Sequence, residues 1–256
     1  MKQALEFIII GTTKVGEKSL VLHTLSAEYG RRSFIVSISK SSSMALYLPL
    51  NILSGEVSDN HLSDLWRVSG LRAEYSLSGI RGEVRKNTMT MFLSEVLFRC
   101  LRDGEYSPDL YGWCRQSILT LDSLGTHDDP PLDSGSQDSP SFENGFGDVV
   151  NSGNGVVVGD GVVVWDGVAN FHLLWLLDLC TVMGFSPRLE DLMPFADDRL
   201  EDIRALLTLD RSSALLLPLS GSRRSDIAAI LLEYLGYHLD TRLNIRSLSV
   251  LRELYS

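Results

Sequence analysis

The chain has 256 residues, of which 44% are hydrophobic and 22% are charged, and its formal net charge at pH 7 is -10. This composition is typical of a globular protein with sizeable cores, and no uninterrupted apolar run is long enough for a membrane-spanning helix. The apolar run near the first residue is too short for a signal peptide. We therefore expect a cytoplasmic protein with no membrane partner.

The first 80 residues have the pattern of short strands. Glycine-containing turn signals follow the first two segments, and no intervening helix is long enough for a βαβ unit. The sequence therefore predicts a small closed barrel. The expected strands are Leu5–Thr12, Ser19–Ser26, Arg32–Ile38, Leu46–Val57 and Asp64–Ala73.

The segment GTTKVGEKS, from Gly11 to Ser19, is similar to a phosphate-binding loop. That loop requires Gly-Lys-Ser without a gap, whereas here Glu17 stands between Gly16 and Lys18. A carboxylate at this point opposes phosphate, and the residues that follow favour a strand over a helix. We therefore do not expect nucleotide hydrolysis.

From Arg85 onward the apolar residues recur every three or four positions, which predicts helices. The most apolar helix, 169–185, is expected to be buried by its neighbours, with Asn170 as its N-cap and Gly184 at its end. Ser107 followed by Pro108 marks another helix start. The other expected helices run from Arg85 to Asp103, from Ser107 to about Leu124, from Arg199 to Thr208, from Ser225 to His238 and over the last residues from Ile245.

Residues 125–168 interrupt this helical pattern. They are rich in Asp, Ser, Pro and Gly, which is typical of a disordered or loosely held loop. At its end, two valine triplets flank Gly159-Asp160-Gly161, and this arrangement predicts a short exposed hairpin.

No motif in the chain requires an enzyme or a cofactor. Cys100, Cys114 and Cys180 fall inside expected helices without a CxxC pair, so buried thiols are the simplest interpretation. The five histidines have no metal-ligand spacing, and His172 on the apolar helix is best interpreted as a core residue. We find neither a GxSxG motif nor a paired-carboxylate pattern.

The charge is unevenly distributed along the chain. Residues 1–86 carry 11 Lys or Arg against 8 Asp or Glu, whereas residues 87–256 carry 12 against 25. The barrel cations suit contact with a phosphate backbone, and Tyr29, Phe34, Tyr47 and Trp66 are available for base stacking. An ordinary solvated surface is the alternative. These barrel cations are Lys14, Lys18, Arg31, Arg32, Lys40, Arg67, Arg72, Arg81, Arg85 and Lys86.

Several segments, in this order, resemble the bacterial recombination mediator family RecO, particularly its Bacteroides-like forms. They are IIIGTTKVGEKSLVLHTLSAEYGRRSFIV, KNTMTMFLSEVLFRCLRDGEYSPDLYGWCRQSILTLD, ANFHLLWLLDLCTVMGFSPRLED and LNIRSLSVLRELY. Only the loop 125–168 lacks a counterpart. The resemblance implies an α+β protein, with an N-terminal five-stranded OB-fold barrel over residues 1–80 and an all-helical domain over residues 81–256.

The resemblance also implies a function without catalysis. The implied activity is binding of single- and double-stranded DNA, annealing of complementary strands, and loading of RecA, together with RecR, onto DNA coated by single-strand-binding protein. The implied partners are RecR and the acidic C-terminal tail of single-strand-binding protein. The residues that we expect to contact DNA are Lys14, Arg31, Arg32, Lys40, Arg72, Arg85 and Lys86.

Two departures from the family pattern qualify this expectation. Many relatives carry a four-cysteine zinc site, which this sequence lacks, so we predict no structural zinc. The family's loop after the third strand is rich in Lys and Arg, whereas SKSSSMAL here offers only Lys40. The alternative function is therefore a protein-interaction scaffold whose barrel has lost direct DNA binding.

Overall fold

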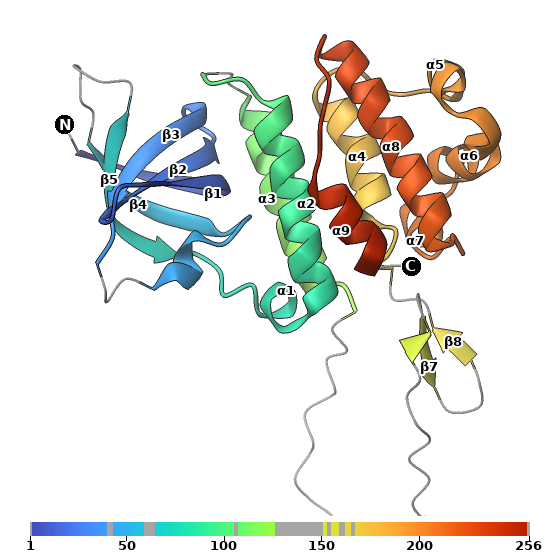
Figure 1. The fold of residues 1–256 in the computed structure, drawn as a ribbon, viewed down its shortest axis with the longest axis horizontal. Helices are drawn as coiled ribbons and strands as arrows, with labels where there is room; N and C mark the ends of the chain where they lie inside the picture. The colour runs from blue at the N-terminus through green and yellow to red at the C-terminus, as the bar shows by residue number, and fades with distance from the viewer. Residues whose placement is uncertain are drawn as a thin grey trace, which may run out of the picture.

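The structure is a computed structural model that describes residues 2–39, 43–58, 65–104, 107–125, 151–152, 155–158, 162–164 and 167–254. A closed five-stranded barrel is followed by a group of packed helices (Figure 1). The barrel strands are β1 (Lys2–Val15), β2 (Ser19–Ser26), β3 (Gly30–Ser37), β4 (Ile52–Ser58) and β5 (Trp66–Ala73).

The strand order around the barrel is β1-β2-β3-β5-β4, and β1 closes the barrel by pairing with both β2 and β4. Strands β3 and β5 are parallel, whereas the other neighbouring strands are antiparallel. This topology is that of an OB fold, which confirms the predicted fold class. Ser19 begins a strand and not a helix, so the Gly11–Ser19 segment has no helix N-terminus for a phosphate.

The expected strand Leu46–Val57 is wrong at its beginning. Met44–Tyr47 forms a short 3-10 helix, η1, and Leu50 has a φ of 60°, a left-handed conformation that a regular strand cannot contain. Strand β4 therefore begins only at Ile52. The apolar run alone does not reveal this turn, because Leu50 is buried whether it lies in a strand or in a turn.

The helical part confirms the expected helices and adds several short ones. Helix α2 contacts α1 and α9, α3 contacts α1 and α4, and α4 lies beside α8 (Figure 1). The helices are α1 (Ser78–Gly82), α2 (Val84–Cys100), α3 (Pro108–Ser123), α4 (Phe171–Val182), α5 (Leu189–Leu192), α6 (Leu200–Thr208), α7 (Arg211–Leu215), α8 (Gly221–His238) and α9 (Ser247–Leu254), with the 3-10 helices η2 (Met193–Phe195) and η3 (Asp197–Arg199).

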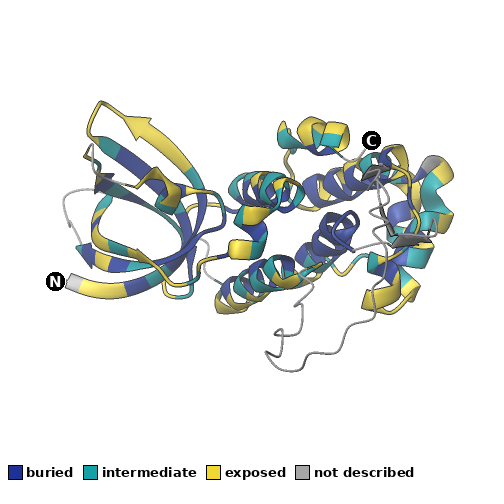
Figure 2. Ribbon diagram, turned by 90° about the horizontal axis from the view of Figure 1, so that it is seen from below, coloured by how far each residue is buried: buried dark blue, intermediate teal, exposed yellow. Residues whose placement is uncertain are grey.

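Helix α4 is the buried centre of the helical part, as its composition predicts. Nearly all of its side chains are buried, and Figure 2 shows the helices turning their dark blue, buried sides toward one another. The helix ends as expected, since Gly184 has a φ of 91° and the N–H of Phe185 donates to the carbonyl of Cys180.

Asn170 occupies the predicted N-cap position of α4, but its side chain does not cap the helix. Its side chain makes no capping bond to α4 and instead donates to the carbonyl oxygens of Ala214, Leu215 and Leu217, at 3.3, 3.0 and 2.7 Å. These carbonyls lie at and after the end of α7, where the carbonyl of Ala214 also accepts from the N–H of Leu217 at 3.3 Å. Asn170 therefore ties the end of α7 to the start of α4.

A three-stranded sheet lies between α3 and α4 in the sequence. Its strands β6 (Asn151–Ser152), β7 (Gly155–Val158) and β8 (Val162–Val164) pair in sequence order, and β7 and β8 are antiparallel. The two valine triplets thus form the predicted hairpin. Its Gly159-Asp160-Gly161 turn and residues 126–150 lie outside the described residues.

The barrel and the helices share one hydrophobic core, which we call the shared core. In β1, Phe7 and Ile9 belong to the barrel interior, whereas Ile8 and Ile10 pack with the residues of the helices. Strand β1 is therefore buried on both sides. The barrel residues of the shared core are Ile8, Ile10, Leu25, Leu50 and Ile52, each at most 2% exposed.

Gly79 lies where α1 meets the end of α3, and its substitution should be strongly destabilising. A methyl group on residue 79 would lie 2.0 Å from the carbonyl oxygen of Asp122, whose carboxylate also accepts from the N–H of Ile80 at 2.7 Å. Because the added methyl group would meet a backbone carbonyl, no rotation of a side chain can relieve the clash. We expect Gly79→Ala to lower the free energy of unfolding by about 3 kcal/mol in chemical denaturation.

Gly82 in the same helix is the matched control, because a methyl group there meets nothing within 4 Å. Gly82→Ala should change the free energy of unfolding by less than about 1 kcal/mol. Equal denaturation midpoints for the two variants would contradict the close approach at Gly79.

Glu95 of α2 fixes the start of the last helix, α9. Its carboxylate accepts hydrogen bonds from the backbone N–H groups of Arg246 and Ser247, at 3.1 and 2.8 Å, and from the Ser247 hydroxyl at 2.5 Å. Burial raises the pKa of Glu95, but these bonds and the nearby Arg99 together outweigh it, so that the pKa lies below its ordinary value. Glu95 is thus an N-cap supplied from another helix.

Glu95→Gln should lower the free energy of unfolding by about 1 kcal/mol at neutral pH, because the charge at the start of α9 is lost. Since the folded pKa of Glu95 is lowered, its stabilisation is present above the unfolded pKa and is lost as pH falls through the folded pKa. The stability difference between the wild type and Glu95→Gln should therefore shrink below the ordinary pKa of 4.5. Glu253→Gln, an exposed change on α9, is the control, and a pH-independent difference would contradict the assignment.

Candidate nucleic-acid interface

The predicted DNA contacts that reach the surface in the described residues lie on different elements of the protein. Lys14 is exposed near the end of β1, and Arg72 on β5 is 79% exposed, with its Nε 2.8 Å from the Ser54 hydroxyl. Arg85 at the start of α2 forms an ion pair with Glu83 at 2.8 Å. Lys40 lies outside the described residues. The expected set is therefore dispersed and does not form one compact cluster.

Arg31 at the start of β3 points toward the helices. Its guanidinium donates to the carbonyl oxygens of Phe98, at 2.8 Å, and of Leu101, and its Nε lies 2.9 Å from the carboxylate of Asp103. The guanidinium also lies over the Phe98 ring, and the side chain is only 14% exposed. In this conformation Arg31 joins the barrel to the end of α2, where carbonyls lack helical partners.

The main effect of Arg31→Gln should therefore be on the free energy of unfolding, and the effect on the affinity of the folded protein for DNA should be smaller. Losing the ion pair and leaving two carbonyls short of a donor should lower the free energy of unfolding by about 2 kcal/mol. Arg72→Gln removes the same charge from an exposed site and should change it by less than about 0.5 kcal/mol. Thermal unfolding checks the contrast, and equal melting temperatures would show that Arg31 does not join the two parts.

Lys86 is also internal, although it was expected to contact DNA. It is 1% exposed, and its Nζ donates to the carbonyl oxygen of Asp122 at 2.9 Å and lies 3.8 Å from the Glu83 carboxylate. It falls on the buried side of α2 with Met89, Thr90 and Leu93. The helical spacing of these residues in the sequence already indicates this placement.

Arg32, the next residue along β3, takes part in a cluster that we call the barrel-end cluster, formed with Tyr29 and Trp66. The Arg32 guanidinium lies 3.6 Å from the centroid of the Trp66 ring and 5.8 Å from that of Tyr29. The two rings meet edge to face at 5.2 Å, and the Tyr29 hydroxyl donates to Gln3 at 2.7 Å. Cation–π contacts of this kind hold a guanidinium without neutralising its charge.

Strand pairing explains how these residues come together. The parallel register of β3 and β5 places Trp66 opposite Phe34, and Arg32 is two residues before Phe34 on the same side of β3. Tyr29 lies in the turn that precedes β3. The Nε of Arg32 is buried and has no hydrogen-bond partner in the described part of the chain. The sequence contains a signal for this placement, because Arg32 has the same parity as the inward-facing Phe34 and Val36.

Two of the four aromatic residues expected to stack with bases cannot do so in this structure. Phe34 is fully buried and Tyr47 is 8% exposed, and both belong to the barrel interior. Tyr29 and Trp66 are half-buried at the edge of that interior. Among these four, only Tyr29 and Trp66 of the barrel-end cluster are therefore accessible to a stacking partner.

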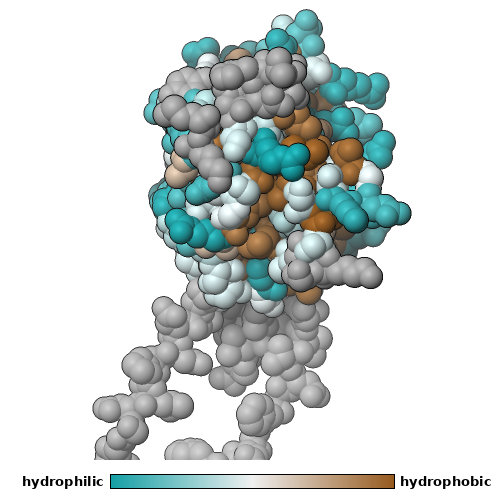
Figure 3. All heavy atoms as spheres, turned by 90° about the vertical axis from the view of Figure 1, so that its left-hand side faces the viewer, coloured by the Kyte–Doolittle hydropathy of each residue, from teal (hydrophilic) through white to brown (hydrophobic). Residues whose placement is uncertain are grey.

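A hollow of about 330 Å³ opens beside β5, and its apolar lining includes Val36, Leu46, Val68 and Leu71. Arg67, which is exposed and whose guanidinium donates to the Ser37 hydroxyl at 3.3 Å, also lines it. Figure 3, which faces the side of the barrel away from the helices, shows hydrophobic residues in the middle with hydrophilic residues around them. The hollow itself combines apolar contact area with a cationic side chain.

The remaining candidate residues fit structural roles. Cys100, Cys114 and Cys180 are buried free thiols, as predicted. His172 is 2% exposed, and burial, followed by the charge of Arg224, lowers its pKa to about 3, so it is a neutral core residue. Among the described residues, no group of three or more His, Cys, Asp or Glu side chains could hold a metal ion. None of the described helices is long and apolar enough to cross a membrane.

Comparison with known proteins gives relatives of one kind. The DNA repair protein RecO of Phocaeicola vulgatus is 23% identical over 274 residues, which cover 97% of each chain. The proteins of the same name from Bacteroides fragilis and Flavobacterium johnsoniae are 24% and 22% identical over 276 and 275 residues, again covering 97% of each chain. No family model matches the chain.

The fold and the interface together define an OB-fold protein with an attached helical part and a cation–aromatic cluster on its barrel. Within this class, the chain resembles the RecO proteins over nearly its whole length. The resemblance seen in the sequence segments is thereby confirmed.

Proposed function

We propose that this protein is a non-enzymatic mediator of DNA repair and recombination in the cytoplasm. It binds single- and double-stranded DNA, anneals complementary strands and helps to load recombinase onto single strands coated by single-strand-binding protein. Its partners are RecR and the acidic C-terminal tail of single-strand-binding protein. The observation that carries this proposal is the likeness, over 97% of each chain, to proteins named DNA repair protein RecO.

In this proposal Lys14, Lys40 and Arg72 of the barrel part and Arg85 at the start of α2 contact the phosphate backbone, while a base stacks at the barrel-end cluster. Arg32 supplies a further positive charge there. Arg31 and Lys86 are not included, because their side chains are already bound inside the protein. Base-specific recognition is not part of the proposal, since a mediator has to act on any sequence.

The reaction is driven by binding and not by covalent chemistry. Cationic side chains neutralise part of the phosphate charge, which reduces the repulsion between two complementary strands. Pairing then becomes faster because both strands are held near the same protein. The protein is not consumed in annealing, so the rate of annealing depends on the protein concentration and the salt concentration.

Fluorescence anisotropy of labelled single-stranded oligonucleotides tests this function. Four phosphate contacts and the charge of Arg32 should give a slope of about -3.5 when the logarithm of the binding constant is plotted against the logarithm of the salt concentration. Two oligonucleotides of unrelated sequence should bind alike. A folded protein that binds neither at low salt, or that prefers one sequence strongly, would disprove the proposal.

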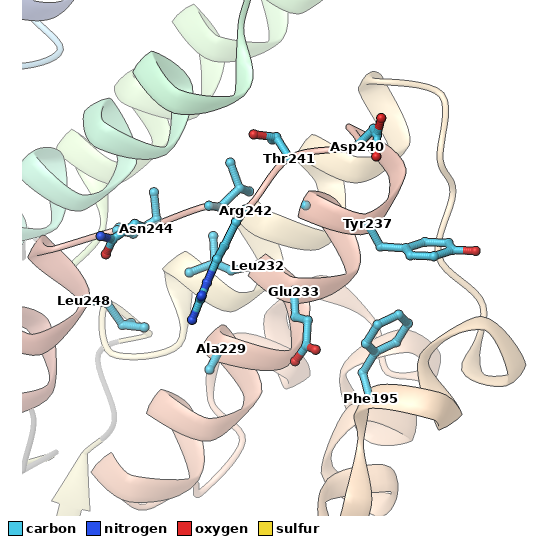
Figure 4. Close-up of a pocket in the computed structure, with 13 residues that line it drawn as sticks. Phe195, Ala229, Leu232, Glu233, Tyr237, Asp240, Thr241, Arg242, Asn244 and Leu248 are labelled. Carbon is cyan, nitrogen blue, oxygen red and sulfur yellow. The ribbon is translucent and has the colours of Figure 1, made fainter.

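A protein-interaction scaffold is the second candidate, and one observation favours it. A groove of about 770 Å³ lies between α8 and the segment that connects α8 to α9, with Leu232, Leu243 and Leu248 in its lining (Figure 4). Such a groove suits a protein partner. Binding of RecR by a chain that does not bind DNA would select this function over the first.

A further inference from the structure

The hollow beside β5 lies where strands β3 and β5 separate. The two parallel strands pair over only two residues each, and the last pair is Ile35 with Arg67. Strand β3 ends at Ser37, whereas β5 continues to Ala73. Beyond Arg67, the side of β5 that faces away from β4 therefore has no strand next to it among the described residues. The hollow opens at this separation, and residues of η1 also line it.

The lining of the hollow combines buried apolar residues with exposed hydroxyl groups. Val36 and Val68 are 6% and 2% exposed, and Leu46 and Leu71 are half-buried. A volume of about 330 Å³ is at the lower end of the range for small-molecule pockets, so the hollow suits one ring system. The serines that line it, all exposed, are Ser37, Ser43 and Ser69.

Arg67 brings a positive charge to the hollow that no neighbouring carboxylate balances. Its side chain is exposed, and its one hydrogen bond in the described part of the chain goes to the Ser37 hydroxyl at 3.3 Å. Glu56 of the neighbouring strand β4 is opposite Ser69, but it forms no ion pair with Arg67. None of the described residues that line the hollow is acidic. The guanidinium of Arg67 is therefore available to an anion.

The hollow and the barrel-end cluster lie along the same line, where β3 and β5 meet. Trp66 is paired with Phe34, and the hollow begins two residues further along both strands, at Val68 and Val36. Two residues of a strand span about 7 Å. Neighbouring nucleotides in one strand of duplex DNA rise by only about 3.4 Å, so bases at both places would have to be unstacked from each other. Arg67 comes between the two places in the sequence of β5.

We propose that the hollow beside β5 holds one unstacked nucleobase of a single strand, next to the base at the barrel-end cluster, and that Arg67 binds the phosphate between them. This proposal rests on the proposed DNA-binding function and deepens it. Arg67 was not among the residues expected to contact DNA. A nucleotide joins a flat ring to an anion, which matches an apolar hollow with one cation beside it. The flexible serine hydroxyls accept any base, as a mediator requires.

The test fills the hollow without changing any charge. Ser69 is exposed on β5, so Ser69→Leu places an apolar side chain in the hollow. Ser43→Leu fills the hollow from the side of η1 and serves as a second variant in case the first does not fold. Ser222→Leu, at an exposed position of α8, is the matched control. Thermal unfolding verifies that each variant folds.

Fluorescence anisotropy then compares a labelled oligothymidylate with a strand of the same length whose sugar-phosphate backbone carries no bases. Ser69→Leu and Ser43→Leu should each weaken the binding of oligothymidylate at least about fivefold, because one base loses its site. Their affinity for the strand without bases should stay within about twofold of that of the wild type, because the phosphate contacts are unchanged. Ser222→Leu should match the wild type with both strands.

Arg67→Gln tests the phosphate contact separately. It should weaken the binding of both strands alike and reduce the steepness of the salt dependence by about 0.7, the share of one phosphate contact on a single strand. Arg204→Gln removes the same charge from an exposed position of α6 and should leave the salt dependence unchanged. An unchanged salt dependence for Arg67→Gln would overturn the phosphate contact.

Filled variants that keep the full preference of the wild type for the strand with bases would disprove the base site and leave the proposed function intact. Failure of the wild type to bind either strand at low salt would instead disprove the proposed function. Loss of binding to purified RecR in Ser69→Leu, with unchanged affinity for both strands, would assign the hollow to a protein partner, which also overturns this inference.

Discussion

Trp66→Ala should weaken the binding of a single-stranded oligonucleotide by between about 5-fold and 150-fold. A base that stacks on an aromatic side chain contributes about 1 to 3 kcal/mol, and Trp66 presents the larger ring of the barrel-end cluster. Phe34 and Tyr47 cannot replace it, because both are buried in the barrel interior. The measurement is anisotropy at fixed salt.

The expected mechanism involves an exchange of partners on Trp66. The Arg32 guanidinium occupies one face of the indole at 3.6 Å, so a base stacks there only after the guanidinium moves or by stacking on the guanidinium itself. Either way, the positive charge of Arg32 stays beside the strand. Arg32→Gln should therefore weaken binding and also reduce its salt dependence, whereas Trp66→Ala should leave the salt dependence unchanged.

Trp113 provides the control for Trp66→Ala. It is half-buried on α3, where its ring packs against Trp175 of α4 at 5.3 Å. Trp113→Ala should lower stability without changing the affinity of the folded protein for DNA. Equal DNA affinities for the Trp66 and Trp113 variants would remove the barrel-end cluster from the interface.

A chain that ends at residue 80 should fail to fold, although it contains all five barrel strands. It would expose the barrel side of the shared core, whose five aliphatic residues each contribute about 1.5 to 3 kcal/mol when buried. Their sum, about 7 to 15 kcal/mol, is as large as the whole stability of a typical domain, about 5 to 15 kcal/mol. Circular dichroism should show no cooperative unfolding transition for this fragment.

Hydrogen exchange in the full chain is the complementary measurement. Because β1 packs against the helices, amides of β1 and of α2 should open with the same free energy. The division into residues 1–80 and 81–256 would then describe the order of the elements and not two independent folding units. A stable, cooperatively folding barrel fragment would contradict this expectation.

The regular elements could be predicted because their periodicity is a direct consequence of burial. The alternation of Phe34 and Val36 gives β3, and the apolar run after Asn170 gives α4. The short helix α1 was not predicted, because it follows Leu77, whose φ of 47° depends on the tertiary position of that residue. Local propensity does not contain this information.

The interface was harder to predict than the fold, because a sequence gives the type of a side chain and not its partner. Arg31 looks like a surface cation, yet the carbonyls of Phe98 and Leu101 bind it inside the protein. The partner atoms are backbone atoms of another element, which have no signature in the sequence. The contact between Arg32 and Trp66 likewise depends on the register of β3 and β5, which only the structure gives.

The adjacency of Arg31 and Arg32 has a kinetic and entropic consequence. The carbonyl of Arg31 accepts the N–H of Gly104 at 2.9 Å, and its side chain is anchored at the end of α2, so the main chain at this point is immobilised from the far side. Arg32 can then leave Trp66 only by rotating its own side-chain bonds. The Arg32 guanidinium and a base should therefore exchange rapidly on Trp66. The DNA strand should meet a preorganised surface, because the conformational entropy of this surface has already been lost during folding.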